Sequence, residues 1–386
     1  MKVKQVYALT NEAMKEVLGE ETVVQEDLSN VVDLGKSLQD ANDVDNYVRT
    51  IHDKIGRMVF VDRVYGGRAP SVLMDEWEYG SILEKIASEM PEAEENEDWE
   101  LTNNTSYDPN IFKKPTVITK LFNGRVTFEI PISTTEEQVK SAFTSATQLN
   151  AFYSMIHTAV QNSMTVKMDA LVMRTINNMI GETFYAEVPG GTYTGRTGPK
   201  CVNLLYEYNQ QFSLSLTAAE CLTTPAFIRF AAKRMADYID RLKVISTLFN
   251  AGGAERFTPE DRLHVVLLSE FRTAADIYLQ SDTFHDAYTR LPNSESVTYW
   301  QGSGTGYAFE DTSEVNVVTS GSHTVNVTGV LGVMFDRYAL GVSNLDRRVN
   351  TYYNPKASFW NEWHKFTAGY FNDLNENFVV FYVAAA

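Results

Sequence analysis

Carboxylate side chains are concentrated in one short stretch of the chain, on either side of Pro91. The stretch contains Glu89 and then Glu92, Glu94, Glu95, Glu97, Asp98 and Glu100. A block of like charges favours an extended, solvated loop, because the carboxylates repel one another. A second interpretation is a projecting loop whose acidic tip contacts a basic patch on a neighbouring subunit. Calcium binding is a third, but the stretch lacks the D-x-D-x-D-G spacing of an EF-hand loop.

The glycine-rich segments do not match nucleotide-binding motifs. Gly191 to Gly198 lacks the G-K-[ST] ending of a phosphate-binding loop. Gly302, Gly304 and Gly306 lie between strand-like segments, whereas a dinucleotide-binding loop opens a helix. These segments therefore predict turns and no cofactor site.

Residues for metal-dependent or nucleophilic catalysis are also not arranged in known motifs. None of the six histidines belongs to an H-E-x-x-H sequence or stands at ligand spacing from another His or Cys. The chain has no G-x-S-x-G nucleophile elbow. A catalytic triad is defined by geometry, but every motif considered points to a protein that is not an enzyme, without catalytic residues, cofactor or metal.

Composition narrows the function classes further. The 386-residue chain has a net charge of −17, which disfavours a broad nucleic-acid-binding surface because phosphate contacts need Lys and Arg. Its hydrophobic fraction of 44% is enough for a large core. Cys201 and Cys221 make no disulfide framework and are expected to be free thiols. No stretch has the apolar length of a membrane span, and the N-terminus lacks the apolar region of a signal peptide.

The longest predicted element is a spine helix over Ser133 to Gly181, with a break near Gln148 to Asn150. Ser133 and Thr134 each stand three residues before a glutamate, which is the signature of a capping box. An apolar stripe then follows at three- and four-residue steps, and Gly181 is expected to end the helix. The stripe consists of Leu149, Phe152, Ile156, Val160, Met164, Met168, Leu171, Met179 and Ile180.

The other segments predict an arm, a hairpin and a mixed lobe. The first 57 residues contain two short amphipathic helices and an extended tract that suits an arm lying on another subunit. Asn123-Gly124, between two β-rich runs, predicts a hairpin of Thr116–Phe122 with Val126–Ile132. Beyond Gly181, helices are expected over Pro225–Asn250 and Glu270–Thr283. Strands are expected over Met58–Tyr65, His264–Ser269, Val297–Trp300, Tyr307–Phe309 and Val325–Phe335, with Phe378–Val383 as a central strand because it is apolar on both faces.

The order of these parts, with several local sequences, resembles the major capsid proteins of tailed bacteriophages, which have the Hong Kong 97 fold. The similarity covers essentially the whole chain and is closest to phages that infect Gram-positive bacteria. No single motif is diagnostic, but the ordered set is specific. It consists of DLSNVVD at 27–33, FVDR at 60–63, APSVLMD at 69–75, WEYG at 77–80, SYDPN at 106–110, VTFEIP at 126–131 and RTINNMIG at 174–181.

The resemblance implies an α+β fold, a domain order and a structural role. Residues 1–57 would form an N-terminal arm, 58–123 the E-loop region with the acidic run, and 124–185 the P-domain with its spine helix. Residues 186–335 would form the A-domain, and 336–386 would return into the P-domain.

The protein would self-assemble into hexamers and pentamers of an icosahedral head that encloses double-stranded DNA. A scaffolding protein, a portal and decoration proteins are its expected partners, without a membrane. Because the arm begins almost at Met1, the scaffold is expected to be a separate protein. The covalent crosslink known in the type member is not carried over to this chain.

Two other functions compete with this interpretation. An encapsulin-like compartment shell would share the fold but load a protein cargo. A ligand-binding protein or enzyme would use the acidic stretch Glu92 to Glu100 as its site, and would lose ligand affinity when those residues are neutralised.

Overall fold

The structure is a computed structural model that describes most of the chain beyond residue 66. The described residues are 15, 66–72, 83–91, 93, 103–104, 106, 110, 112–135, 146–189, 193–280, 294–301 and 309–384. The chain divides into two compact units, Met1–Arg63 with Ser145–Ile156 and Val64–Thr144 with His157–Ala386. Apart from Lys15, which is helical, the predicted arm helices lie outside the described residues. The predicted strand Met58–Tyr65 and the acidic residues 92, 94, 95, 97, 98 and 100 lie outside them as well.

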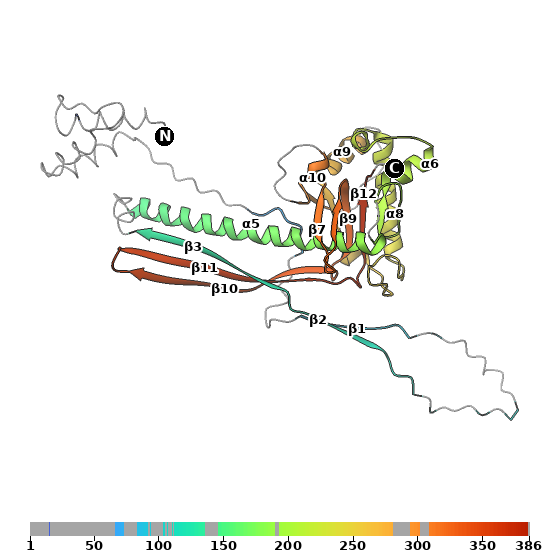
Figure 1. The fold of residues 1–386 in the computed structure, drawn as a ribbon, viewed down its shortest axis with the longest axis horizontal. Coiled ribbons are helices and arrows are strands. Elements are labelled where there is room, and N and C mark those ends of the chain that lie inside the picture. Colours follow the sequence, from blue (N-terminus) through green and yellow to red (C-terminus); the bar gives the residue numbers. More distant parts are fainter. Residues whose placement is uncertain are drawn as a thin grey trace. The chain divides into compact units, whose positions relative to one another are not determined.

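A five-stranded mixed sheet, called the core sheet here, lies in the lobe of the second unit that also contains α6 (Leu204–Phe212), α8 (Pro225–Leu242) and α9 (Ser269–Gln280) (Figure 1). Its strand order is β4-β12-β9-β5-β6, with β12 parallel to β4, β5 parallel to β6, and antiparallel pairs elsewhere. The strands are β4 Cys201–Asn203, β5 Leu263–Leu268, β6 Glu295–Val297, β9 Val330–Asp336 and β12 Phe378–Tyr382. The prediction that the last strand is central is confirmed.

Helices pack on both faces of β12, which explains why its residues are apolar on both sides. On one face Phe381 meets Tyr238 of α8 edge to face, with 5.2 Å between ring centroids. On the other face Tyr382 meets Phe184 of helix α5, Ala146–Glu187, with 4.9 Å between ring centroids. The helices of this lobe are α6 Leu204–Phe212, α7 Ala218–Cys221, α8 Pro225–Leu242, α9 Ser269–Gln280 and α10 Phe309–Thr312, with the 3-10 helix η3 Glu260–Arg262.

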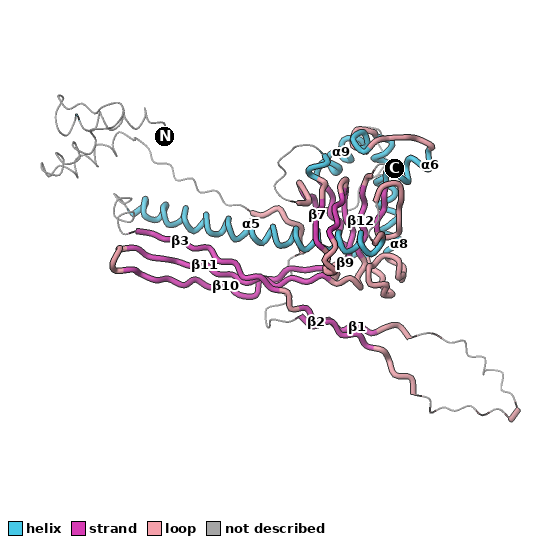
Figure 2. Tube along the Cα trace, viewed as in Figure 1, coloured by secondary structure: helices cyan, strands magenta, loops and turns pink. Residues whose placement is uncertain are grey.

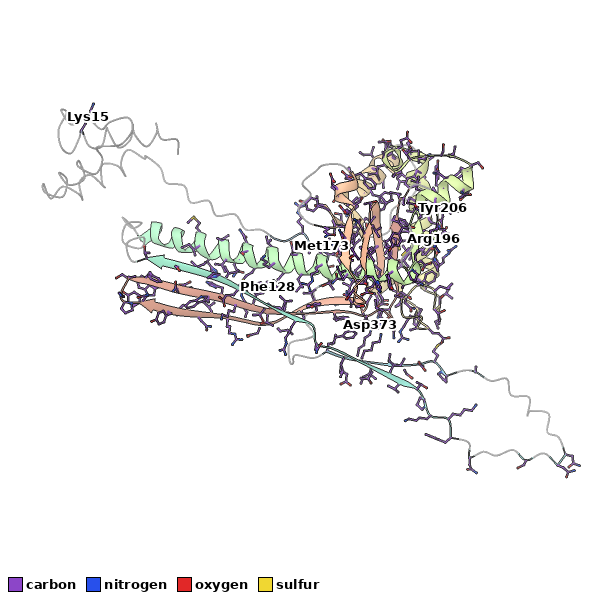
Figure 3. The ribbon with its side chains drawn as sticks, viewed as in Figure 1. Lys15, Phe128, Met173, Arg196, Tyr206 and Asp373 are labelled. Atoms are coloured by element: carbon purple, nitrogen blue, oxygen red, sulfur yellow. The ribbon has the colours of Figure 1, made fainter. Side chains whose placement is uncertain are left out.

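A second sheet of three long antiparallel strands, called the open sheet here, has the order β10-β11-β3. Its strands are β3 Arg125–Thr135, β10 Leu340–Asn354 and β11 Phe359–Asn372. One face of β3 packs against helix α5, where Val160 and Met164 form a small cluster with Phe366. Figure 3 labels Phe128 on this face, and its ring stacks on Phe366 at 5.0 Å.

Helix α5, Ala146–Glu187, corresponds to the predicted spine helix, but it begins and ends later in the sequence than predicted. Its 42 residues correspond to about 63 Å at 1.5 Å per residue. The predicted break near Gln148 is wrong, because the helix is continuous there. The predicted capping box is also wrong, because Ser133 and Thr134 belong to β3 and pair with Asn361 and Trp360 of β11. The apolar stripe is confirmed at Val160, Met164 and Leu171, which are buried.

Gly181 lies inside α5 and does not end it. A Cβ atom at this position would collide with the side chain of Val317 on β7. Strand β7, Val315–Val318, pairs with β8, Thr324–Val327, in a separate two-stranded sheet that rests on the helix at this point. The glycine is therefore required for close packing, and the helix continues for six more residues to Glu187.

The predicted hairpin around Asn123-Gly124 is wrong, although both of its strands exist. Strand β2, Val117–Phe122, pairs with β1, Leu83–Ser88, in a two-stranded ribbon. Strand β3 pairs with β11 instead. Figure 2 shows the ribbon outside both larger sheets. Asn123 and Gly124 are consequently the link between two sheets.

Four further predictions need correction. The strand predicted over Val297–Trp300 is β6, which ends at Val297. The helix predicted over Pro225–Asn250 ends at Leu242. The run Val325–Phe335 is two strands, β8 and β9, separated by Gly329 with φ +75°. The strand predicted at Tyr307–Phe309 is contradicted at Phe309, which begins α10.

The C-terminal segment 336–386 was expected to return into the P-domain. Strands β10 and β11 do join β3 in the open sheet, but β12 joins the core sheet. The segment is therefore divided between two sheets.

Candidate functional site

Among the described residues, no group of three or more His, Cys, Asp or Glu side chains could hold a metal ion. No helix in the described part of the chain is long and apolar enough to cross a membrane. One hollow, of about 800 Å³, is an open groove between α6 and α8 that is lined by Arg229, Lys233 and Phe230 among others. In its lining the hydroxyl of Thr197 donates to Glu207 at 3.1 Å, and Arg234 donates to both oxygens of that carboxylate.

The two cysteines are unreactive thiols in the interior. Both Cys201 and Cys221 are free and buried. Burial, and then the nearby carboxylate of Glu187, raises the pKa of Cys201 well above its ordinary value. Burial raises the pKa of Cys221 to about 12. Because the thiolate is the nucleophilic form, neither residue is suited to catalysis at neutral pH.

The ribbon of β1 and β2 has the features of a contact surface. Strand β1 alternates regularly between half-buried and exposed residues, and β2 does the same. The outward face presents Ile86, Val117 and Leu121 with exposures of 63%, 54% and 64%. Ile86 lies opposite Thr119, so Val117 and Leu121 are its diagonal neighbours across the ribbon. Phe112, just before β2, is 84% exposed.

The inward face of the ribbon is attached to the body of the second unit. Lys85 on β1 and Lys120 on β2 point to the turn between β11 and β12, where both reach Asp373 at 2.7 and 2.8 Å. Phe122 packs on Phe371 with 5.3 Å between ring centroids. Figure 3 labels Asp373. A two-stranded ribbon is marginally stable by itself, so these contacts are needed to keep its outward face presented.

The open sheet supplies a second exposed surface. Along β10 every residue from Asp346 to Tyr353 is exposed, including Val349 and Tyr352. On the adjoining strands Lys365 pairs with Glu129 at 2.9 Å. Arg348 pairs with Asp346 at 3.2 Å. A long edge strand with both faces exposed is a template for association with another chain.

The sequence pointed to a projecting loop but not to these surfaces. The six acidic residues of the predicted contact site lie outside the described residues, so the structure does not place them. Of the two strands of the ribbon, the sequence predicts only β2, and it pairs that strand with Val126–Ile132 in a hairpin. The sequence of β1, LEKIAS, does not alternate between apolar and polar residues, although burial alternates along the strand, so it carries no clear strand signal.

A family described as Phi29-like phage major capsid protein matches residues 8–382 of the chain. No curated protein matches it.

Among solved structures, a chain in "Structure of head fiber and inner core protein gp22 of native bacteriophage P68" aligns with 10% identity and a TM-score of 0.53, over 85% of this chain and 87% of that chain. "Capsid structure of Staphylococcus phage Andhra" contains a chain with 10% identity and a TM-score of 0.49, over the same shares of the two chains.

The family match decides between the functions that the sequence left open, because it covers nearly all of the chain. The mixed α+β fold is the phage capsid fold of the Hong Kong 97 type. The family is structural and not enzymatic, and its members are located in the virion capsid. The chain belongs to the Phi29-like phage major capsid protein family and is a major capsid protein of icosahedral phage heads.

Proposed function

We propose that this chain forms hexamers and pentamers of a head that encloses double-stranded DNA, and that the ribbon is a principal contact between subunits. The observation that carries the proposal is the apolar outward face of the ribbon, with Ile86, Val117 and Leu121 more than half exposed. Contiguous exposed apolar surface marks an interaction site. In a shell made of one major protein, the partner for this face is a second copy of the chain.

The proposed domain order follows the Hong Kong 97 pattern. Residues 1–57 are the N-terminal arm, 58–123 the E-loop region, 124–185 the P-domain and 186–335 the A-domain. The ribbon is the base of the E-loop in this scheme, and the open sheet with α5 belongs to the P-domain. The core sheet belongs to the A-domain and recruits β12 from the C-terminal segment. A scaffolding protein, a portal and decoration proteins are the proposed partners.

The acidic run of Glu92, Glu94, Glu95, Glu97, Asp98 and Glu100 is proposed as a subunit contact. In the sequence it lies between the two strands of the ribbon. Exposed Arg347 and Arg348 on β10 offer the opposite charge to a neighbouring copy. Such contacts at an exposed surface weaken with salt, because the Debye length falls from about 10 Å at 0.1 M to about 3 Å at 1 M.

The proposal is tested by making the ribbon face polar. We expect Ile86→Ser with Leu121→Ser to leave folding intact, since both side chains are already exposed, but to abolish assembly of purified protein in negative-stain images. Ile277→Ser is the matched control, because Ile277 on α9 is also 57% exposed. It should leave assembly unchanged.

Normal shells from the double ribbon variant would disprove the role of the ribbon. A wild-type chain that stays monomeric, both alone and with a scaffold, would count against hexamers and pentamers.

A further inference from the structure

Five charged side chains meet where the ribbon joins the body of the second unit. Lys85 lies 2.7 Å from Asp373 and 2.6 Å from Glu376, measured from its Nζ atom to the carboxylate oxygens. Lys120 lies 2.8 Å from the other oxygen of Asp373. Arg256 approaches Glu376 at 3.6 Å. We refer to these five residues as the charge cluster.

The acceptor side of the cluster is rigid. The side chain of Asp373 is only 3% exposed. Its Oδ1 atom also accepts a hydrogen bond from the backbone N–H of Asn375 at 3.1 Å. Its own backbone N–H donates to the carbonyl of Ala339 at 2.7 Å. The position of the carboxylate is thus determined by the turn between β11 and β12, independently of the ribbon.

The donor side belongs to the ribbon, with one lysine from each strand. Lys85 and Lys120 occupy directly opposite positions in the β1–β2 register. Lys85 also donates to the backbone carbonyl of Tyr338 at 3.2 Å. Two donors from two strands that converge on one carboxylate fix the ribbon in rotation as well as in position.

The covalent connection from the ribbon to the open sheet is short. It consists of Asn123 and Gly124, between the end of β2 and the start of β3. The carbonyl of Gly124 accepts from the N–H of Tyr370 at 3.0 Å. A Cβ at Gly124 would lie 2.7 Å from the carbonyl oxygen of Tyr370, so only glycine fits there. This close packing anchors one end of the link and makes it a natural pivot.

We propose that Asp373 is a positioning residue for assembly, because its carboxylate holds Lys85 and Lys120 and so sets the direction in which the ribbon leaves the body. This inference rests on the proposed role of the ribbon in subunit contacts. Without the charge of Asp373, Glu376 is the one carboxylate that the charge cluster keeps, against the three cations of Lys85, Lys120 and Arg256. The repulsion among these cations then rotates the ribbon away from the body of the second unit, with Asn123 and Gly124 as the pivot.

The experiment measures the direction of the ribbon in unassembled subunits. Spin labels are attached at Thr119→Cys on the ribbon and Ala236→Cys on α8, both of which are exposed positions. The native Cys201 and Cys221 are buried, so labelling is selective. Distances between the labels are then recorded by double electron–electron resonance.

The test variant is Asp373→Asn, which retains an oxygen for the N–H of Asn375 but loses the charge. We expect a single narrow distance distribution in the parent and a broadened or shifted one in the variant, which should keep a cooperative melting transition at a lower temperature because the ionised carboxylate contributes to stability. Lys120→Gln changes only the ribbon side and should act in the same direction. The matched control is Glu207→Gln, which breaks a part-buried pair with Arg234 at 2.7 Å, away from the ribbon. It should leave the distances unchanged.

Two outcomes would overturn the proposal. One is an unchanged narrow distribution in both Asp373→Asn and Lys120→Gln. The other is loss of the melting transition in Asp373→Asn with an unchanged distribution in Lys120→Gln, which would make Asp373 a residue of the body fold only. Failure of the unlabelled wild-type chain to assemble, alone and with a scaffold, would contradict the proposed function, while the label distances would still decide the role of Asp373.

Discussion

The core sheet and the open sheet differ in how completely the chain itself covers them. Strands β9 and β12 of the core sheet are buried at every position. In the open sheet, β3 alternates between half-buried and exposed residues, and most of β10 is exposed. The core sheet has helices on both faces of β12, whereas the open sheet meets α5 through a cluster of only a few apolar residues.

This difference separates folding from assembly. A sheet covered on both faces gains its hydrophobic stabilisation inside one subunit, at about 25 cal/mol per Å² of buried apolar surface. The open sheet and the ribbon leave apolar side chains in solvent, so that part of their stabilisation is available only when another molecule covers them. Changes in the core sheet should therefore affect folding, and changes in the ribbon should affect assembly.

The largest expected effect is in the core sheet. Phe381→Ala removes a fully buried ring that packs on Tyr238, and we expect a loss of about 3–5 kcal/mol in the free energy of unfolding. Phe366→Ala in the open sheet should cost less, because its small cluster can collapse more easily. Urea unfolding of unassembled subunits measures both. Equal losses would remove the distinction between the two sheets.

An intermediate effect is expected where the helix meets the small β7–β8 sheet. Gly181→Ala adds a methyl group that collides with Val317, so we expect destabilisation of about 1–3 kcal/mol despite the better helix propensity of alanine. Val317→Ala should relieve much of that loss when combined with it. Thermal melting of the single and double variants provides the test, and a more stable Gly181→Ala would contradict the observed packing.

The smallest effect concerns pH. Burial by itself raises the pKa of Asp373, but hydrogen bonds from Lys120 and Lys85 outweigh it, so the pKa lies below its ordinary value. The pKa of Asp in the unfolded chain is about 3.9. The stabilisation that the ionised carboxylate of Asp373 provides is therefore fully present above about pH 3.9, and it is lost as the pH falls through the lower pKa of the folded state. Glu376 and Arg256 are the other charged groups of the cluster.

The spin-label distances of the parent should therefore stay constant from pH 7 to pH 5 and broaden only in stronger acid. Broadening between pH 7 and pH 5 would show that the ribbon is held by a group other than Asp373.

Much of the core could be predicted from the sequence, because strongly apolar runs determine burial locally. The run at Phe378–Val383 predicted a central strand, and the stripe from Val160 to Met168 predicted the helix face on the open sheet. The hairpin at Asn123-Gly124 failed because local turn preference was outweighed by pairing of β3 with β11, more than 200 residues later in the chain. The capping box at Ser133 failed for the same reason.

The charge cluster could not have been found from the sequence. Lys85 and Asp373 are separated by 288 positions, and neither belongs to a motif. From the sequence, Gly181 is predicted to end the helix. Its role in packing could not be predicted, because Val317, whose side chain leaves no room for a Cβ at this position, lies on a strand remote in the sequence. Features that depend on contacts between segments remote in the sequence leave no pattern in the local sequence. Periodic burial does leave one, because apolar residues then recur at regular spacing.

A cryo-electron microscopy map of the assembled head tests most directly whether the ribbon is covered only on assembly. We expect Ile86, Val117 and Leu121 to be buried against a neighbouring copy of the chain, while the core sheet keeps the packing of the single subunit. A closed shell in which the outward face of the ribbon remains exposed to solvent in every subunit would contradict this expectation.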